Sequence, residues 1–139
     1  MRSLKKILKI SVMTFMVVSI GTVSAALAAG FNNVVVKAYS NNTELGTYRV
    51  STTTSKGQVK LTAMEMNKAV FSASYFNTTN SSWSSIAGQT YYDSLKEVKN
   101  ISYGSNRAAG TQIKIKVKNN NWTNVTRKIS GYYYVNGDV

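Results

Sequence analysis

The sequence predicts an all-β fold, a single small antiparallel β-sandwich or barrel of six to seven strands that follows a cleaved signal peptide. Short segments in which apolar and polar residues alternate recur along the chain, and this period is typical of half-buried strands. Segments rich in Asn, Ser, Thr and Gly separate them, and these residues favour turns. No strand-helix-strand rhythm appears, so a parallel sheet is not expected.

Residues 1–28 have the pattern of a secretory signal peptide, and residues 29–139 are expected to form one secreted β domain. Basic residues precede an apolar run at 10–23, and small residues follow it. Cleavage is expected after Ala28, with a second candidate site after Ala25. The alternative is an uncleaved anchor, but the apolar run is short for a membrane span.

In the first half of the domain, apolar residues alternate with polar ones between polar turns. Residues 58–63 show the pattern most clearly, because Val59 and Leu61 share one face while Lys60 lies on the other. Turns rich in Asn or ending in Gly separate the segments. The expected strands are residues 34–39, 47–54, 58–63 and 69–76.

The middle of the domain is harder to assign. Residues 77–85 are expected to form a polar loop that contains Trp83. Residues 91–102 match a helix through the spacing of Tyr91, Leu95 and Val98, or an irregular strand over 96–103. The surrounding β pattern favours the strand, and residues 104–110 are expected to form a loop.

The clearest strand covers residues 111–118. Ile113, Ile115 and Val117 are expected to point into the core, and the lysines between them are expected to be exposed. Three Asn residues at 119–121 suit a tight reversal. The segment 122–129 is therefore predicted to pair with this strand as a hairpin and to continue to residue 135.

The composition excludes most catalytic and metal sites. The chain of 139 residues contains no Cys, no His and only five Asp and Glu residues. Ser-His-Asp triads, Cys-His pairs and ordinary zinc sites are therefore absent, and the acids form no spaced pair suited to proton transfer. We expect no catalytic residue, no metal, no cofactor and no enzymatic activity.

Basic residues dominate the charge of the expected domain. Residues 29–139 carry 13 Lys and Arg against 5 Asp and Glu, a net charge of +8. On strand 111–118, alternate lysines would lie on one face about 7 Å apart. The hypothesis is a patch for an anionic cell-wall polymer or a membrane surface. Its members are Lys114, Lys116, Lys118, Arg127 and Lys128. The alternative is an ordinary solvated face.

Aromatic side chains are the second group of candidate contact residues. Trp83 and Trp122 lie in polar surroundings, and a Tyr run occupies positions 132 to 134. Such rings either fill the edge of the core or stack on sugar rings and membrane interfaces. The candidates are Trp83, Trp122, Tyr132, Tyr133 and Tyr134. No nucleic-acid motif is present.

The layout of the domain resembles a family of small secreted β-rich proteins of uncharacterised function from low-GC Gram-positive bacteria. The resemblance rests on an aromatic-led segment from Phe31, the strand Val59-Lys60-Leu61, and the tail Ile129-Ser130-Gly131-Tyr132. It implies an extracellular, all-β domain and carries over no catalytic residues. In that family an acidic segment follows the tail, whereas here Tyr133 and Tyr134 follow it.

A leader, a basic body and an aromatic tail are also similar to bacteriocins of the lactococcin 972 type, although this chain has no His. The sequence thus favours a secreted, non-enzymatic β domain that acts at or near the cell envelope of a Gram-positive bacterium. A bacteriocin-like secreted toxin is the alternative.

Overall fold

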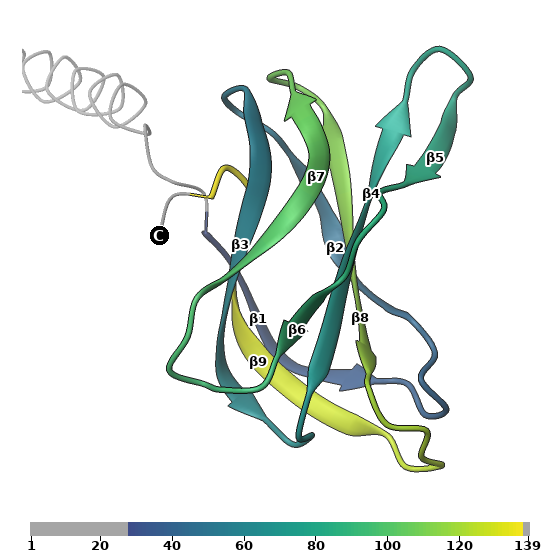
Figure 1. The fold of residues 1–139 in the computed structure, drawn as a ribbon, viewed down its shortest axis with the longest axis vertical. Coiled ribbons are helices and arrows are strands. Elements are labelled where there is room, and N and C mark those ends of the chain that lie inside the picture. The colour runs from purple at the N-terminus through teal and green to yellow at the C-terminus, as the bar shows by residue number, and fades with distance from the viewer. Residues whose placement is uncertain (1–27, 138–139) are drawn as a thin grey trace, which may run out of the picture.

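A computed structural model describes residues 28–137, which form nine strands and no helix (Figure 1). The prediction of an all-β fold is therefore confirmed. The predicted signal peptide lies outside the described residues, apart from Ala28, which begins β1. The strands are β1 (Ala28–Val36), β2 (Thr43–Arg49), β3 (Thr54–Met64), β4 (Ala69–Asn77), β5 (Ser82–Ser85), β6 (Thr90–Tyr92), β7 (Lys99–Arg107), β8 (Gln112–Asn119) and β9 (Arg127–Tyr134).

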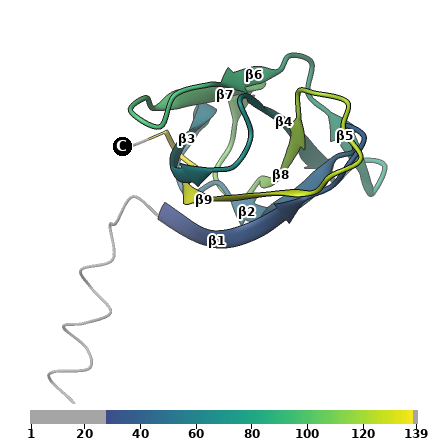
Figure 2. The ribbon, with the colours of Figure 1, turned by 90° about the horizontal axis from the view of Figure 1, so that it is seen from below.

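The strands form two separate antiparallel sheets that pack against each other as a sandwich. Sheet A has the order β1-β9-β3-β7, and sheet B has the order β2-β8-β4-β5, with β6 also paired to β4. The view from below shows the strands around a common interior (Figure 2). Nine strands rather than six to seven are present, partly because the expected loop at 77–85 contains β5 and the ambiguous segment contains both β6 and the start of β7.

The predicted hairpin between residues 111–118 and 122–129 is wrong. β8 pairs with β2 and β4 in sheet B, whereas β9 pairs with β1 and β3 in sheet A. Both edges of β8 are already occupied, so the connection at 120–126 carries the chain from one sheet to the other. Alternation identifies the inward face of a strand, but it does not identify the neighbouring strand.

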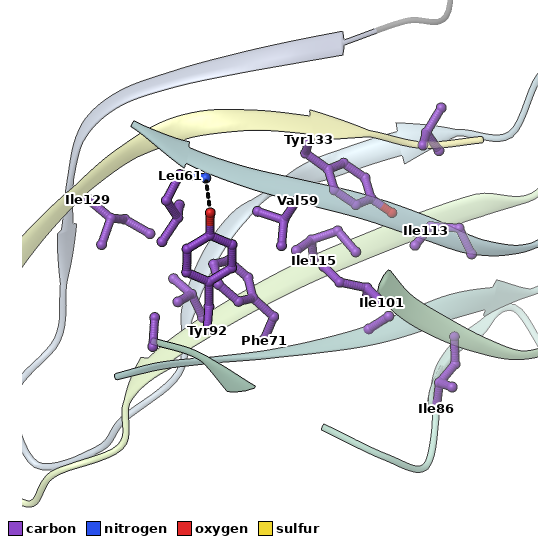
Figure 3. Packing of buried hydrophobic residues seen from close by; sticks show 14 of the residues in the cluster. Val59, Leu61, Phe71, Ile86, Tyr92, Ile101, Ile113, Ile115, Ile129 and Tyr133 are labelled. Atoms are coloured by element: carbon purple, nitrogen blue, oxygen red, sulfur yellow. Dashed lines mark hydrogen bonds between the residues drawn. The ribbon is translucent and has the colours of Figure 1, made fainter. Parts of the chain in front are cut away.

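The core lies between the two sheets and is built from their inward faces (Figure 3). On β8 the three predicted core residues, Ile113, Ile115 and Val117, are completely buried, so this part of the prediction is confirmed. Other fully buried side chains from the two sheets are Val59, Leu61, Phe71, Tyr92, Ile101, Tyr103, Ile129 and Tyr133. A core of this kind explains how the chain folds without disulfides.

Tyr92 on β6 connects the two sheets through its hydroxyl group. The Leu61 amide of β3 donates a hydrogen bond to this oxygen at 3.0 Å (Figure 3). The hydroxyl in turn donates to the Glu97 carbonyl. The ladder between β3 and β7 has ended at Val59 and Lys99. The tyrosine therefore satisfies a buried amide that the neighbouring strand no longer reaches.

Two tyrosines and two glycines shape the packing around β9. A Cβ at Gly131 would lie 2.3 Å from the Lys60 carbonyl oxygen, so only glycine fits where the backbone of β9 approaches that of its neighbour β3. Gly57 makes room for the hydroxyls of Tyr103 and Tyr133, which hydrogen-bond to each other. The Tyr103 hydroxyl also donates to the Val135 carbonyl at 2.5 Å. Burial raises the pKa of both tyrosines above the ordinary value.

Candidate functional site

The predicted lysine row lies on the outer face of sheet B. Lys114, Lys116 and Lys118 alternate with buried residues of β8, so they share the face directed away from the core. β8 lies between β2 and β4, with Thr47 and Ser74 opposite Lys114. The row thus runs through the interior of a sheet and not along a free edge.

The lysines are half-buried, which corrects the expectation that they would be exposed. The Lys114 side chain is only 19% exposed; its Nζ lies 3.5 Å from the Glu44 carboxylate and 4.2 Å from the Trp83 ring centroid. Lysine side chains in general bury their aliphatic stems against neighbouring residues and keep the charged ends near water. Two β4 residues of this outward face, Val70 and Ser74, are only 2% and 3% exposed.

Trp83 belongs to the same face because β5 pairs with β4. Trp83 lies opposite Phe76 in the ladder, and the two rings meet edge to face with centroids 5.5 Å apart. At the other end of β4, Tyr91 of β6 lies opposite Val70, with the Lys68 ammonium 5.7 Å from its ring centroid. The ammonium groups of Lys68 and Lys114 therefore each lie over an aromatic ring, in a cation–π arrangement.

We call this surface the lysine–aromatic face. It consists of Lys68, Phe76, Trp83, Tyr91, Lys114, Lys116 and Lys118. Glu44 of the neighbouring strand β2 lies opposite Lys116, and its carboxylate forms an ion pair with Lys114. Among residues 28–137, neither Lys116 nor Lys118 forms an ion pair, so the charge of both remains available to an external anion.

The other two cations of the predicted patch are separated from the row. Arg127 and Lys128 begin β9 in sheet A, where they pair with Val36 and Val35 of β1. Lys128 adjoins the buried Ile129 and therefore faces the outside of sheet A. The patch of five cations does not form, because the two strands belong to different sheets.

The tyrosine run of β9 divides between core and surface. Tyr133 is completely buried and packs against Tyr48 with ring centroids 4.7 Å apart, so its prediction as a contact residue is wrong. Tyr132 is exposed on the outer face of sheet A, opposite Lys60. Tyr134 is half-buried beside Gln58.

Among residues 28–137, Trp122 is the most exposed large apolar side chain, at 77%. Its partner Tyr39 lies far from it in the sequence. Its ring meets that of Tyr39 at a centroid distance of 5.4 Å, and the Tyr39 amide donates to the Thr123 carbonyl at 2.7 Å. Tyr39 and Ser40 both have positive φ, which is uncommon for a bulky residue. Sequence reasoning found Trp122 but missed Tyr39, because no local pattern pairs the two loops.

A cleft with two arginines was also missed. It has a volume of about 570 Å³ and lies where β4 leads into β5 and β7 leads into β8. Arg49 and Arg107 line it, and no acidic side chain of residues 28–137 does. The two arginines are far apart in the sequence and sit in unremarkable contexts, so only the folded chain brings them together.

Metal and membrane-spanning features are not seen in the part of the chain that the structure describes. No three acidic side chains between residues 28 and 137 gather into a group suited to a metal ion. The same residues include no helix of the length and hydropathy needed to cross a bilayer.

Comparisons of the chain with protein-family models, curated proteins and solved structures give no match. The two resemblances drawn from the sequence layout therefore stay hypotheses, and the function has to be inferred from the geometry of the molecule itself.

Proposed function

We propose that this chain is a secreted, non-enzymatic domain that adsorbs to anionic polymers of the cell wall through the lysine–aromatic face. The observation that carries the proposal is the lysine row on β8. Trp83 restrains Lys114 in this row, and Glu44 partly neutralises its charge. The predicted signal peptide is consistent with this location.

Preorganisation favours this face over the exposed cations Arg127 and Lys128 of β9. A free lysine loses side-chain entropy when it binds, about 1.5–2 kcal/mol if it becomes fixed. Lys114 is already restrained by Trp83 and by Glu44, so less of that entropy remains to be lost. An anion that approaches the face meets ammonium groups whose positions are partly set.

The shape of the face favours an extended polymer over a compact ligand. From Lys114 to Lys118 the row extends about 14 Å along the strand, at the usual strand rise. A polymer with repeated charges can engage several lysines in succession, and each contact raises the effective concentration for the next one. Individual exposed ion pairs contribute at most about 1 kcal/mol, so the repeated contacts supply the affinity.

The proposal is tested by sedimentation of the purified protein with Gram-positive cell walls that either retain their phosphate-rich polymers or have been stripped of them. We expect strong adsorption to intact walls at low salt and a steep decrease near 0.15 M salt, where charges are screened over about 8 Å. Stripped walls should bind little.

Vesicles of phosphatidylglycerol form the comparison arm of the same experiment. Equal adsorption to intact and stripped walls would contradict the proposal, and so would adsorption that does not respond to salt. Strong binding to vesicles with none to intact walls would replace the wall polymer by the membrane as the target.

A further inference from the structure

The arginine cleft has the chemistry of a second binding site, which adjoins the lysine–aromatic face at Phe76. Its walls come from the end of β2, the end of β4 and the β7–β8 connection, which meet at one end of the sandwich (Figure 1). Its volume of about 570 Å³ lies within the range of about 300–1,000 Å³ that is common for small-molecule sites.

Arg107 is fixed in the cleft by three contacts. Its guanidinium carbon lies 3.8 Å from the Tyr75 ring centroid. Its Nε and one terminal nitrogen, Nη2, donate to the Tyr103 carbonyl at 3.0 and 2.8 Å. The other terminal nitrogen, Nη1, makes no hydrogen bond to the described residues and remains available to a ligand.

Arg49 approaches the cleft from β2 and is oriented in a similar way. Its Nη1 donates to the Gly110 carbonyl at 3.2 Å, which leaves the rest of the guanidinium group open. Both arginines are thus positioned by neutral backbone oxygens. Because no carboxylate of the described part of the chain lines the cleft, neither positive charge is neutralised by these residues.

The remaining polar groups of the cleft suit a polyhydroxylated ligand. Amide and hydroxyl groups both donate and accept hydrogen bonds, as sugar hydroxyls require. These groups are contributed by Asn77, Thr78, Asn106, Thr111 and Gln112. Guanidinium groups favour compact oxyanions, since their planar forks match phosphate and carboxylate oxygens.

We infer that the cleft binds a sugar that carries a phosphate or a carboxylate, with the anionic group held between Arg49 and Arg107. The two anions share the oxygen geometry that a guanidinium group recognises. This inference is independent of the proposed function, because a small anionic sugar needs the cleft and not the lysine row.

The test is a titration of the purified protein at physiological salt with four probes: glucose 6-phosphate, glucuronate, inorganic phosphate and glucose. Amide NMR signals are the readout, and those of residues 106–112 should shift. We expect one of the two anionic sugars to bind more tightly than inorganic phosphate, and glucose to bind most weakly. The preferred anionic sugar distinguishes phosphate from carboxylate recognition.

Three variants locate the site. Arg49→Gln removes an exposed guanidinium group and should weaken binding of the preferred sugar about tenfold, as expected for loss of a charged hydrogen bond. Gln112→Glu, opposite Arg49 in the ladder, places a carboxylate in the cleft and should abolish binding. Arg127→Gln makes the same charge change outside the cleft and should leave binding unchanged.

Three results would overturn the inference. One is that neither anionic sugar shifts the amide signals of residues 106–112 at concentrations up to about 10 mM. Another is equal weakening by Arg49→Gln and Arg127→Gln, which would indicate a general charge effect. The third is that inorganic phosphate binds as tightly as both sugars, which would show that the amide and hydroxyl groups of the cleft do not recognise the sugar. None of these results depends on adsorption to cell walls.

Discussion

β8 and β9 follow each other in the sequence, both are basic, and both lie in the interior of a sheet, yet they are built differently. From Ile113 to Lys118, β8 alternates between buried aliphatic residues and lysines. β9 has one glycine where the backbone of β3 approaches, and its tyrosines divide between core and surface. The regular alternation of β8 places three lysines in one row on its outer face, whereas the irregular pattern of β9 leaves its cations and its exposed tyrosine apart from one another.

The comparison also shows why cations that are close in sequence need not cooperate. The lysines of β8 share their face with aromatic residues of β5 and β6, which lie earlier in the chain, and Lys114 contacts Trp83 of β5. Arg127 and Lys128 are near in sequence but belong to the other sheet. Strand pairing, and not sequence distance, decides which charges share a surface.

The largest effect should come from the inner face of β8. Ile115→Ala removes a fully buried side chain and should lower the free energy of unfolding by about 2–5 kcal/mol, the usual cost of such a cavity. Urea denaturation followed by circular dichroism measures this change. A loss below about 0.5 kcal/mol, the range of a surface substitution, would show that the assigned inner face of β8 is wrong.

The next effect concerns the close approach at β9. Gly131→Ala should cost about 1–3 kcal/mol, because the added Cβ would clash with the Lys60 carbonyl oxygen. Gly30→Ala on β1 is the control, since its Cβ would meet Tyr132 at an ordinary 3.5 Å. If the two variants unfold at the same urea concentration, the close approach of the β9 and β3 backbones at Gly131 is not present.

Tyr133 of β9 and Tyr103 of β7 give the stability of the protein a pH dependence. Burial raises the pKa of Tyr103 and Tyr133, so both stay neutral in the folded protein, while the unfolded chain ionises near pH 10. Their contribution to stability is complete below about pH 10 and is lost as the pH rises further, by about 1.4 kcal/mol per pH unit for each tyrosine.

This pH dependence can be isolated by substitution. The double variant Tyr103→Phe with Tyr133→Phe should lose stability less steeply than the parent protein between pH 10 and 11.5, as urea midpoints would show. Tyr132→Phe, at an exposed position, should follow the parent. Parallel curves for the parent protein and the double variant would show that these hydroxyls are not buried.

The smallest effect on stability should come from the outer face of β8. Lys116→Ala should change the free energy of unfolding by less than about 0.5 kcal/mol, because Lys116 makes no ion pair with the described residues. Urea denaturation of this variant beside Ile115→Ala compares the two faces of one strand directly. A loss comparable to that of Ile115→Ala would mean that the lysine stems contribute to folding and not mainly to binding.

Much of the fold could be predicted from single strands, because the alternation of Ile113, Ile115 and Val117 with lysines depends only on local geometry. Features that depend on pairing between distant segments could not. The Trp83–Lys114 contact needs β5 to pair with β4, and the Tyr92 bridge needs β7 to begin no earlier than Lys99. The arginine cleft likewise requires the ends of four strands to meet, so Arg49 and Arg107 carried no signal in the sequence.

The central claim is that charge position on β8, and not total charge, determines adsorption to the cell wall. Its most direct test compares two triple variants of equal charge. One replaces Lys114, Lys116 and Lys118 with Gln. The other replaces Lys60, Arg127 and Lys128, which are exposed residues of sheet A, with Gln.

Sedimentation with intact walls at low salt is the measurement. The β8 variant should lose most of its adsorption, and the sheet A variant should retain most of it, provided that circular dichroism shows both to be folded. Equal losses in the two variants, or a larger loss in the sheet A variant, would contradict the account.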